Sequence, residues 1–332
     1  MPKTDPINLV AIGGGTGLST LLKGLKSYLL PDSDPAVKLT AIVTVTDDGK
    51  SSGRLRREFD VLPPGDIRNC LVALADEELP MTKLFRHRFP GDGSVGGHSM
   101  GNLMLLALAQ LGGQMSRDLS DDFLAAIECA SEMLGINARV LPSTLDRVDL
   151  VARLNGNSVK GQVAIKSQTM PIRELSLDPP DASALPAAIQ AIQEAHLITL
   201  GPGSLFTSVI ANLLVRGIAD ALAVSSAKKL YICNAMTEFD ETDGFTAEDH
   251  VRELLEYAPG LKLDYALFNS APISAEMRER YAAEKADRIE PPNASATRDG
   301  TRFITLPLAS EFQAVRHDPE KLSRAIFEVY SR

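Results

Sequence analysis

A glycine-rich loop follows directly on a short apolar run near the start of the chain. The run is Ile7–Ile12, the loop is Gly13-Gly14-Gly15-Thr16-Gly17, and an apolar pattern with helical spacing continues from Leu18 to about Leu29. A second strand is predicted over Leu39–Val45. Strand, glycine loop, helix and strand in this order predict a parallel βαβ unit.

The same alternation of strands and helices returns in the second half of the chain. It predicts strands over His196–Leu200, Leu230–Asn234, Tyr265–Asn269 and Arg302–Leu306, and helices over Ala187–Ala195, Ser204–Val215 and Ala247–Tyr257. Three more helices are predicted over Ile67–Asp76, Asn102–Leu111 and Asp121–Met133. We therefore expect an α/β fold with a mostly parallel sheet and helices on both of its faces.

A β-rich stretch interrupts this alternation. Asp149–Leu154 and Val159–Lys166 flank Asn155-Gly156-Asn157-Ser158, a sequence typical of a hairpin turn. We expect residues 138–180 to form a small β-rich insertion or an edge hairpin. Residues 1–137 would be the N-terminal part with the glycine loop, and residues 181–332 a second α/β part that completes the same sheet and crevice.

The first glycine loop has the properties of a phosphate site. Gly13, Gly14, Gly15 and Gly17 place no side chain in the way of a phosphate, and the helix that follows offers free N–H groups. The pattern is not the dinucleotide fingerprint, because Leu18 stands where a third Gly or Ala belongs, and no Gly-Lys-Ser/Thr of a P-loop follows. The alternative is a plain tight turn.

Two adjacent carboxylates, Asp47 and Asp48, end the second predicted strand. Carboxylates at the carboxyl end of a parallel strand could contact ribose hydroxyls or hold a hydrated Mg²⁺, so both are tentative metal ligands. Neighbouring residues of an extended strand face opposite sides, so we expect only one of the two to reach the pocket. A solvated Asp-Gly turn is the alternative.

Three further segments combine small, polar and basic residues at predicted helix starts. Ser51, Ser52 and Arg54 open a local basic cluster that predicts either an anion site or a solvated helix face. Asp66 is placed as the N-cap of the helix that follows Pro63-Pro64-Gly65, and Asn69 comes three residues later.

His98 and Asn102 lie in Gly96-Gly97-His98-Ser99-Met100-Gly101-Asn102, at the start of an apolar helix. An imidazole flanked by glycines could donate a hydrogen bond to a phosphate or act as a general acid, although a loop histidine that is satisfied by its own surroundings is common. Asn102 is predicted to cap the helix or to contact a ligand.

A second glycine loop repeats the arrangement of the first. It runs Gly201-Pro202-Gly203-Ser204-Leu205-Phe206-Thr207-Ser208, follows a strand and opens a helix. Two such loops in one sheet favour a ligand with a diphosphate. Polar residues that follow or end later strands, Asn234, Thr237 and Asn269, are expected at the rim of the same crevice.

Composition excludes several classes of function. The chain has 34 Lys+Arg against 43 Asp+Glu, a net charge of −9, so a broad nucleic-acid surface is not expected. Its three cysteines form no CxxC pair, which argues against a zinc site or a disulfide framework. We find no signal-peptide pattern and no apolar run of membrane-spanning length, and we expect a cytoplasmic protein without membrane insertion.

Taken together, these motifs resemble the gluconeogenesis factor family. This is the YvcK-like branch of the CofD-like superfamily, which also contains 2-phospholactate transferase. The segments that carry the resemblance are, in chain order, Val10–Ser19 with the first glycine loop, Ala41–Gly49, Leu62–Cys70, Gly97–Leu103, Gly201–Ser208 with the second glycine loop, and Cys233–Thr237. The sequence departs from the pattern usual in the family at Lys50, at Ala211 and over Met236–Thr242.

The resemblance implies a Rossmann-like fold and a role in cell shape and envelope growth on gluconeogenic carbon sources. It also implies binding of UDP-N-acetylglucosamine or a related nucleotide sugar. The function predicted is therefore a nucleotide-sugar-binding regulator with an envelope-synthesis protein as partner, and a homo-oligomer is expected because such folds commonly assemble. The alternatives are a Mg²⁺-dependent transferase of the phospholactyl type that releases nucleoside monophosphate, and a scaffold whose ligand is only structural.

Overall fold

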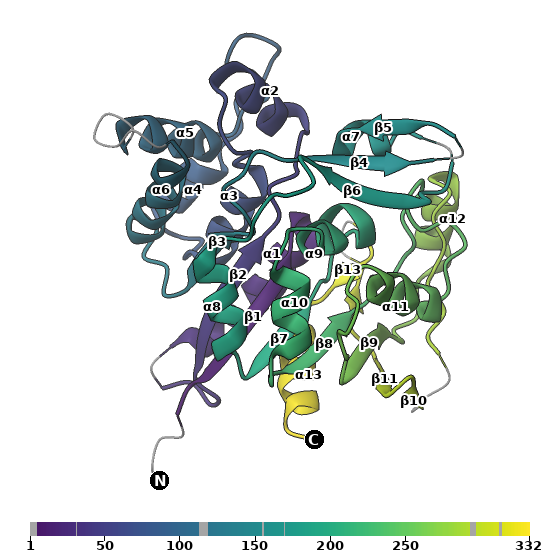
Figure 1. The fold of residues 1–332 in the computed structure, drawn as a ribbon. Coiled ribbons are helices and arrows are strands. Elements are labelled where there is room, and N and C mark those ends of the chain that lie inside the picture. Colours follow the sequence, from purple (N-terminus) through teal and green to yellow (C-terminus); the bar gives the residue numbers. More distant parts are fainter. Residues whose placement is uncertain are drawn as a thin grey trace.

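A computed structural model describes residues 5–30, 32–112, 119–154, 156–168, 170–292, 297–311 and 314–332. Its centre is an eight-stranded sheet in the order β10-β11-β9-β8-β7-β1-β2-β3, in which all neighbouring strands are parallel except β10 and β11 (Figure 1). The strands are β1 (Ile7–Gly13), β2 (Val37–Val43), β3 (Arg139–Pro142), β7 (Leu197–Leu200), β8 (Lys228–Ile232), β9 (Tyr265–Asn269), β10 (Thr297–Arg298) and β11 (Thr301–Leu306). The predicted mostly parallel α/β sheet is confirmed.

Strand order reverses at β1. The chain leaves β1 toward β2 and β3 on one side, and it later returns to form β7 on the other side. Ile12 therefore pairs with Ile42 of β2 and with Leu200 of β7. In open α/β sheets the crevice at such a reversal lies outside the carboxyl ends of the strands, and here it lies between the two glycine loops.

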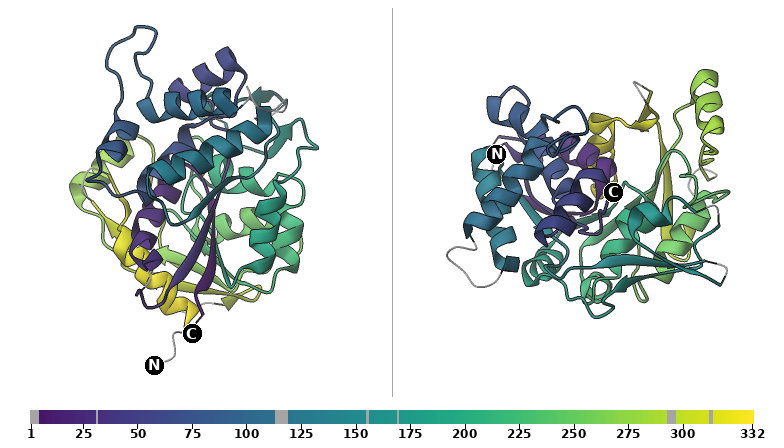
Figure 2. Two further views of the ribbon diagram at one scale, coloured as in Figure 1. Left: turned by 90° about the vertical axis from the view of Figure 1, so that its left-hand side faces the viewer. Right: turned by 90° about the horizontal axis from the view of Figure 1, so that it is seen from above.

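Helices cover both faces of the sheet (Figures 1 and 2). On one face α1 (Gly15–Leu25) packs against α3 (Gly65–Leu74) and α13 (Pro319–Tyr330), and on the other α8 (Pro186–Glu194) packs against α10 (Ile218–Val224). The remaining helical segments are η1 (Lys26–Leu29), α2 (Lys50–Phe59), α4 (Pro80–Arg86), α5 (Met100–Gly112), α6 (Leu119–Met133), α7 (Gln162–Ile165), η2 (Leu205–Ile210), α9 (Ala211–Leu213), α11 (Ala247–Glu256) and α12 (Ala275–Ala283).

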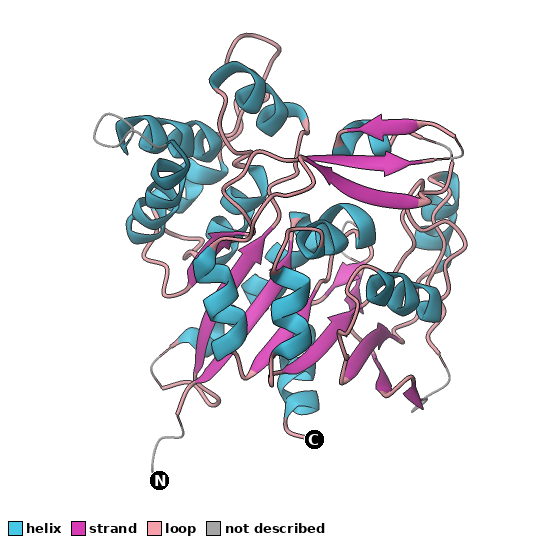
Figure 3. Ribbon diagram, in the orientation of Figure 1, coloured by secondary structure: helices cyan, strands magenta, loops and turns pink. Residues whose placement is uncertain are grey.

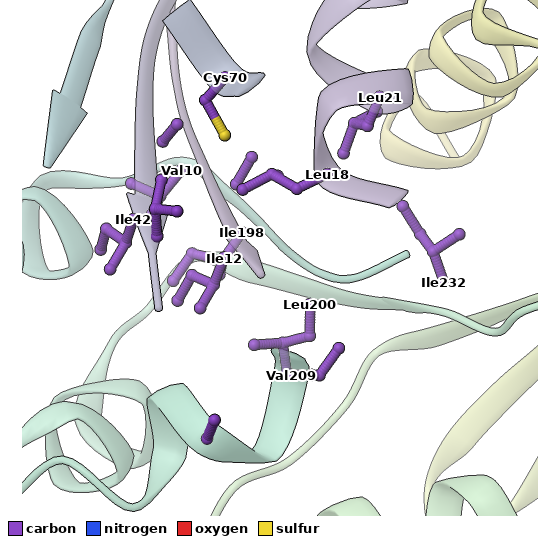
Figure 4. Close-up of a cluster of buried hydrophobic side chains, with 14 of the residues drawn as sticks. Val10, Ile12, Leu18, Leu21, Ile42, Cys70, Ile198, Leu200, Val209 and Ile232 are labelled. Carbon is purple, nitrogen blue, oxygen red and sulfur yellow. The ribbon is translucent and has the colours of Figure 1, made fainter. Parts of the chain in front are cut away.

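The core forms where β1 and its neighbours meet α1 and the segment after β7. Val10, Ile12, Leu18, Leu200 and Ile232 are fully or almost fully buried and converge there (Figure 4). Both faces of these strands are covered, which explains why β1, β2 and β7 are nearly continuous apolar runs rather than alternating ones. The apolar packing fixes the strands from which both glycine loops emerge.

A separate antiparallel sheet lies above the carboxyl ends of the central strands (Figure 3). It consists of β5 (Ser158–Lys160), β4 (Asp149–Arg153) and β6 (Glu174–Asp178), in this order. The predicted β-rich segment is therefore present, but Arg139–Pro142 pairs with β2 in the central sheet. The predicted strand over Val159–Lys166 is wrong after residue 160, because the chain turns at Gly161 (φ 101°) and forms α7.

The other predicted elements agree with the structure to different degrees. The strand predicted over Tyr265–Asn269 matches β9 in full. The continuous helix predicted over Ser204–Val215 is instead the π-helical turn η2 followed by the short α9. A small hairpin of β12 (Ala309–Ser310) and β13 (Arg316–His317) was not predicted. Among the described residues, no helix is both long and apolar enough to cross a membrane.

Candidate functional site

A cavity of about 320 Å³ opens at the reversal point of the sheet, and we call it the loop cavity. Both glycine loops contribute to its wall, together with the loop after β8 and the β13 strand. The predicted residues that line it are Gly14, Gly15, Thr16, Gly17, Gly203, Ser204, Ser208, Asn234 and Thr237. Its place in the sheet is the one that binds ligands in doubly wound α/β folds.

The two glycine loops touch one another through Gly17. A Cβ atom at Gly17 would lie 2.5 Å from the carbonyl oxygen of Pro202 and 2.7 Å from the Cα of Gly203. Asn212 also ties the loops together, because its Nδ2 donates to the carbonyl oxygens of Gly13 (3.0 Å) and Ser208 (2.7 Å). Close approach of two backbones explains why glycine is needed at this position.

Donors in the wall of the loop cavity suit an anion. Helix α1 begins at Gly15, its N-cap residue Gly14 provides no side-chain cap, and the N–H groups of its first turn point out of the helix. Ser208 is 4 % exposed, and its hydroxyl group has no hydrogen-bond partner among the described residues. It would lie 3.7 Å from a Cβ atom at Gly15. A phosphate between the loops would satisfy these donors.

A lysine from the inserted sheet reaches the same wall. Lys166, directly after α7, donates to the Ser204 hydroxyl at 3.0 Å and pairs with Glu241 at 3.1 Å and Glu238 at 3.5 Å. Burial lowers the pKa of Lys166, but the two carboxylates outweigh burial and raise it above its usual value. The lysine is therefore charged at neutral pH and brings a cation to the loop cavity.

Glu241 occupies the helix start of the second loop. It accepts hydrogen bonds from the Thr207 hydroxyl at 2.6 Å and from the Phe206 N–H at 3.3 Å. Thr207 is fully buried and does not line the loop cavity. An internal carboxylate thus takes donors that we had predicted to bind phosphate.

Another part of the wall of the loop cavity combines apolar side chains with a few polar groups. Met236, Tyr281 and Val315 belong to a small hydrophobic cluster, and the Tyr281 hydroxyl accepts a hydrogen bond from the Val315 N–H at 3.1 Å. His317 is 6 % exposed, and its Nε2 has no partner among the described residues. Burial lowers the pKa of His317 to about 4, against the opposing hydrogen bond to the Cys233 carbonyl group.

This depressed pKa predicts a dependence of stability on pH. In the unfolded chain His317 would titrate near 6.5, so between pH 6.5 and 4 the unfolded state binds more protons than the folded state. The free energy of unfolding should therefore fall on acidification across this window, by roughly 3 kcal/mol from this residue. In His317→Asn the amide can still donate to the Cys233 carbonyl group but does not titrate. We therefore expect the free energy of unfolding of this variant, measured by chemical denaturation, to depend less on pH between 6.5 and 4. An unchanged slope would contradict the buried neutral imidazole.

Asp66 is buried between the two glycine loops and a second group of predicted residues. It is not the N-cap of α3: the helix begins at Gly65, with Pro64 as the N-cap residue, and the Asp66 carboxylate accepts a hydrogen bond from the Gly15 N–H instead. Burial and the charge of Asp47 raise the pKa of Asp66 to about 7. The predicted cap is wrong because the helix starts two residues earlier than predicted, at Gly65 instead of Ile67, and Asp66 therefore lies inside its first turn.

The adjacent aspartates do not end a strand as predicted: β2 ends at Val43, and both lie in the loop that follows, where they make contacts in different directions. Asp47 faces Gly65, where a Cβ atom would lie 2.5 Å from its Oδ2, and its Oδ1 accepts from the Gly49 N–H. The Asp48 carboxylate accepts from the Val163 N–H at 2.8 Å and so holds the start of α7. Asp47 and Asp66, rather than Asp48, are the neighbouring carboxylates.

A second cavity of about 400 Å³ contains five more of the predicted residues, and we call it the arginine cavity. Asp47, Ser51, Ser52, Asn69 and Asn102 line it. The Ser51 hydroxyl lies 2.9 Å from His98 Nδ1 and 3.0 Å from Asn102 Nδ2, so Asn102 donates to Ser51. The predicted residues that line a cavity therefore fall into two cavities instead of one.

Several predicted residues line neither cavity. Arg54 donates to the carbonyl oxygens of Gly96 and Ser94 and thereby holds the glycine loop before α5. Burial and nearby Arg54 lower the pKa of His98, which is buried behind Ser51. Asn269 accepts hydrogen bonds from the backbone of the segment that follows β11. The full set outside both cavities is Gly13, Asp48, Arg54, Asp66, His98, Gly201, Thr207 and Asn269.

Some residues of the loop cavity were not predicted. They are Lys166, Glu238, Tyr281, Arg316 and His317. Lys166 was placed at the end of a predicted strand, and Arg316 and His317 carry no motif. The nearest sequence signal was the polar segment after β8, from which Asn234 and Thr237 were predicted at the rim of the crevice.

Comparison with known proteins gives a consistent result. The model of the 2-phospho-L-lactate transferase CofD family matches residues 9–309. A gluconeogenesis factor of Halalkalibacterium halodurans is 40 % identical over 324 residues, covering 97 % of this chain and 96 % of that protein. The gluconeogenesis factor of Listeria monocytogenes is 38 % identical and covers 98 % and 96 % of the two chains. An X-ray structure of a Bacillus halodurans protein superposes with a TM-score of 0.87 at 39 % identity and covers 97 % of this chain and 100 % of that one.

Proposed function

Because the chain belongs to the CofD family and, within it, to the gluconeogenesis factors, we propose that it binds a nucleotide sugar in the loop cavity and acts as a regulator. The single observation that carries this proposal is the contact of two glycine loops at the strand reversal, with the uncapped start of α1 beside them. Such an arrangement suits a diphosphate.

The chemistry of the walls divides the ligand into two parts. The diphosphate lies between the glycine loops, where Ser208 and the α1 N–H groups donate and Lys166 supplies a positive charge. The sugar or base lies toward the apolar wall with Met236 and Tyr281. UDP-N-acetylglucosamine is the ligand that we propose.

In this role the protein would report the supply of an envelope precursor. Ligand binding at the loops after β1, β7 and β8 can change the surface that they form, and this surface would contact a cytoplasmic envelope-synthesis protein. The cellular consequence is a requirement for the protein in cell shape and envelope growth on gluconeogenic carbon sources. Self-assembly as a homo-oligomer belongs to the same proposal.

Gly15→Val tests the phosphate position. Gly15 has φ +59°, and a branched side chain there would enter the space next to Ser208. We expect the affinity for UDP-N-acetylglucosamine, measured by calorimetry, to fall at least 100-fold. Gly91→Val is the matched control, because Gly91 has φ +84° but nothing within 4 Å, so it carries the backbone strain without touching the cavity. Retained affinity in a folded Gly15→Val protein would refute the assignment.

A Mg²⁺-dependent transferase is the second candidate, and one observation favours it. Asp47 and Asp66 are neighbouring carboxylates, and the charge of Asp47 contributes to the raised pKa of Asp66, so a cation between them would relieve their repulsion. Among the described residues, no group of three or more His, Cys, Asp or Glu could hold a metal. Two carboxylates fit Mg²⁺ that completes its shell with water and phosphate oxygens, and the ion would supply charge neutralisation of the phosphoryl group.

The two functions differ in what becomes of the ligand. A regulator returns UDP-N-acetylglucosamine intact after incubation with Mg²⁺, whereas a transferase releases nucleoside monophosphate from a nucleoside diphosphoryl donor. Calorimetry with UDP-glucose, GDP and NAD⁺ as comparators, with and without Mg²⁺, shows which nucleotide is preferred. Preference for a guanine nucleotide, together with cleavage, would establish the transferase.

A further inference from the structure

The arginine cavity lies on the other side of Asp66 from the loop cavity. Gly65 and Asn69, which lie close to Asp66 in the sequence, line the arginine cavity. Gly15 lines the loop cavity, and its N–H donates a hydrogen bond to the Asp66 carboxylate. The two cavities have no lining residue in common. A ligand in the arginine cavity would therefore make its own set of contacts.

The charged side chains of this cavity are mostly cationic. Lys50, Arg68 and Arg88 line it against one carboxylate, that of Asp47, which leaves an excess of two positive charges in a protein of net charge −9. Burial and the charge of Arg88 lower the pKa of Arg68 to about 10. The two guanidinium groups therefore lie close enough to repel each other, and an anion between them would remove that repulsion.

Within the described part of the chain neither arginine forms a salt bridge, although the charges of Asp66 and Asp47 act on Arg68 from a greater distance. Arg68 Nε donates to Asn102 Oδ1 at 3.3 Å, and Arg88 Nη1 donates to the carbonyl oxygen of Gly97 at 2.6 Å. These neutral acceptors fix the two side chains and leave guanidinium N–H groups available. Guanidinium groups present paired donors that match the oxygen atoms of a phosphate or carboxylate.

Additional donors complete the wall. Ser52 is 3 % exposed, lines the cavity, and its hydroxyl makes no hydrogen bond to any described residue. Helix α2 begins beside it at Lys50 without a side-chain cap, so N–H groups of its first turn are free. A hydroxyl group in a cavity wall that no protein group satisfies is available to a ligand or to water.

We propose that the arginine cavity is a second ligand site, which binds an oxyanion, the phosphate or carboxylate group of a small molecule. Arg68 and Arg88 pair with the oxyanion, and Ser52 and the α2 N–H groups donate to it. The carboxylate of Asp47 at the other end of the cavity leaves room there for a neutral or cationic part of the same molecule. This site goes beyond the nucleotide site and does not depend on it.

Amide NMR of the nucleotide-free full chain tests the proposal directly. Inorganic phosphate and, in a second titration, acetate are added at constant ionic strength with chloride. We expect saturable shifts of the amide signals of Lys50–Gly53 with at least one of them, and the titration that saturates at lower concentration identifies the group that the site prefers. The absence of saturable shifts with both anions would overturn the proposal.

Variants locate the bound anion. Arg88→Gln, which removes the charge, should weaken oxyanion binding at least tenfold. Arg68→Lys, which keeps the charge but loses the paired guanidinium donors, should do the same. Arg139→Gln removes an exposed charge at the sheet edge and should leave binding unchanged. Gly15→Val should also leave oxyanion binding unchanged, although it abolishes nucleotide binding in the loop cavity. The two sites can therefore be tested separately. Phosphate binding that is lost in Gly15→Val but retained in Arg88→Gln would place the anion in the loop cavity and refute this inference.

Discussion

Gly17→Ala is expected to abolish nucleotide binding and to destabilise the fold. The added methyl group would lie 2.5 Å from the Pro202 carbonyl oxygen and 2.7 Å from the Cα of Gly203, and these are backbone atoms that no rotamer change can move. The two glycine loops must therefore separate, which removes the geometry that holds the diphosphate. We expect at least a 100-fold loss of affinity in calorimetry and a decrease of about 2–3 kcal/mol in the free energy of unfolding.

The sign of this stability change is informative. Gly17 lies in the first turn of α1, where alanine is intrinsically favoured over glycine by up to about 1 kcal/mol, so helix propensity alone predicts stabilisation. Gly93→Ala is the matched control, because nothing lies within 4 Å of a Cβ atom there. If Gly17→Ala proved as stable as the control and bound nucleotide normally, the loops would not be in contact.

Lys166→Met is expected to have the second large effect. Glu241 has a fully buried side chain, and Lys166 is the cation that compensates it. Removing one partner of a buried ion pair leaves an uncompensated charge, so the free energy of unfolding should fall by about 2–3 kcal/mol. This decrease is smaller than is usual for a fully buried pair, because 37 % of the lysine side chain is exposed. Affinity for the diphosphate should fall more than tenfold, since the same cation lines the loop cavity.

A double variant separates these two effects. Glu241→Gln in the Lys166→Met background removes the uncompensated charge, so it should restore at least half of the lost stability, as measured by chemical denaturation. It should not restore ligand affinity, because the cation is still missing. Full recovery of affinity in the double variant would show that Lys166 only supports the loop and does not act on the ligand.

The sequence was sufficient to predict the parts of the fold that depend on local pattern. Continuous apolar runs predicted β1, β2 and β9, and the glycine loops predicted the backbone turns that directly follow β1 and β7. These features follow from sterics and burial within one segment. The side chains of Asp47 and Asp48 also make different contacts, but both residues lie in the loop after β2, so alternation along a strand is not the reason.

Contacts between distant segments were not predictable from these patterns. Lys166 reaches the loop cavity only because the chain turns at Gly161 into α7, and Asp48 holds that helix start across more than a hundred residues. Thr207 carries a hydroxyl group that could bind phosphate, but this group donates its hydrogen bond to Glu241. The separation into two cavities follows from Asp66, which turns inward to the Gly15 N–H instead of capping its own helix.

A crystal structure of the protein with UDP-N-acetylglucosamine is the most direct test of the proposed ligand site. We expect diphosphate oxygens within about 3 Å of the Thr16 and Gly17 N–H groups and of the Ser208 hydroxyl, with the sugar or base against Met236 and Tyr281. A nucleotide that binds in the arginine cavity alone, or whose diphosphate contacts neither glycine loop, would contradict the proposed site.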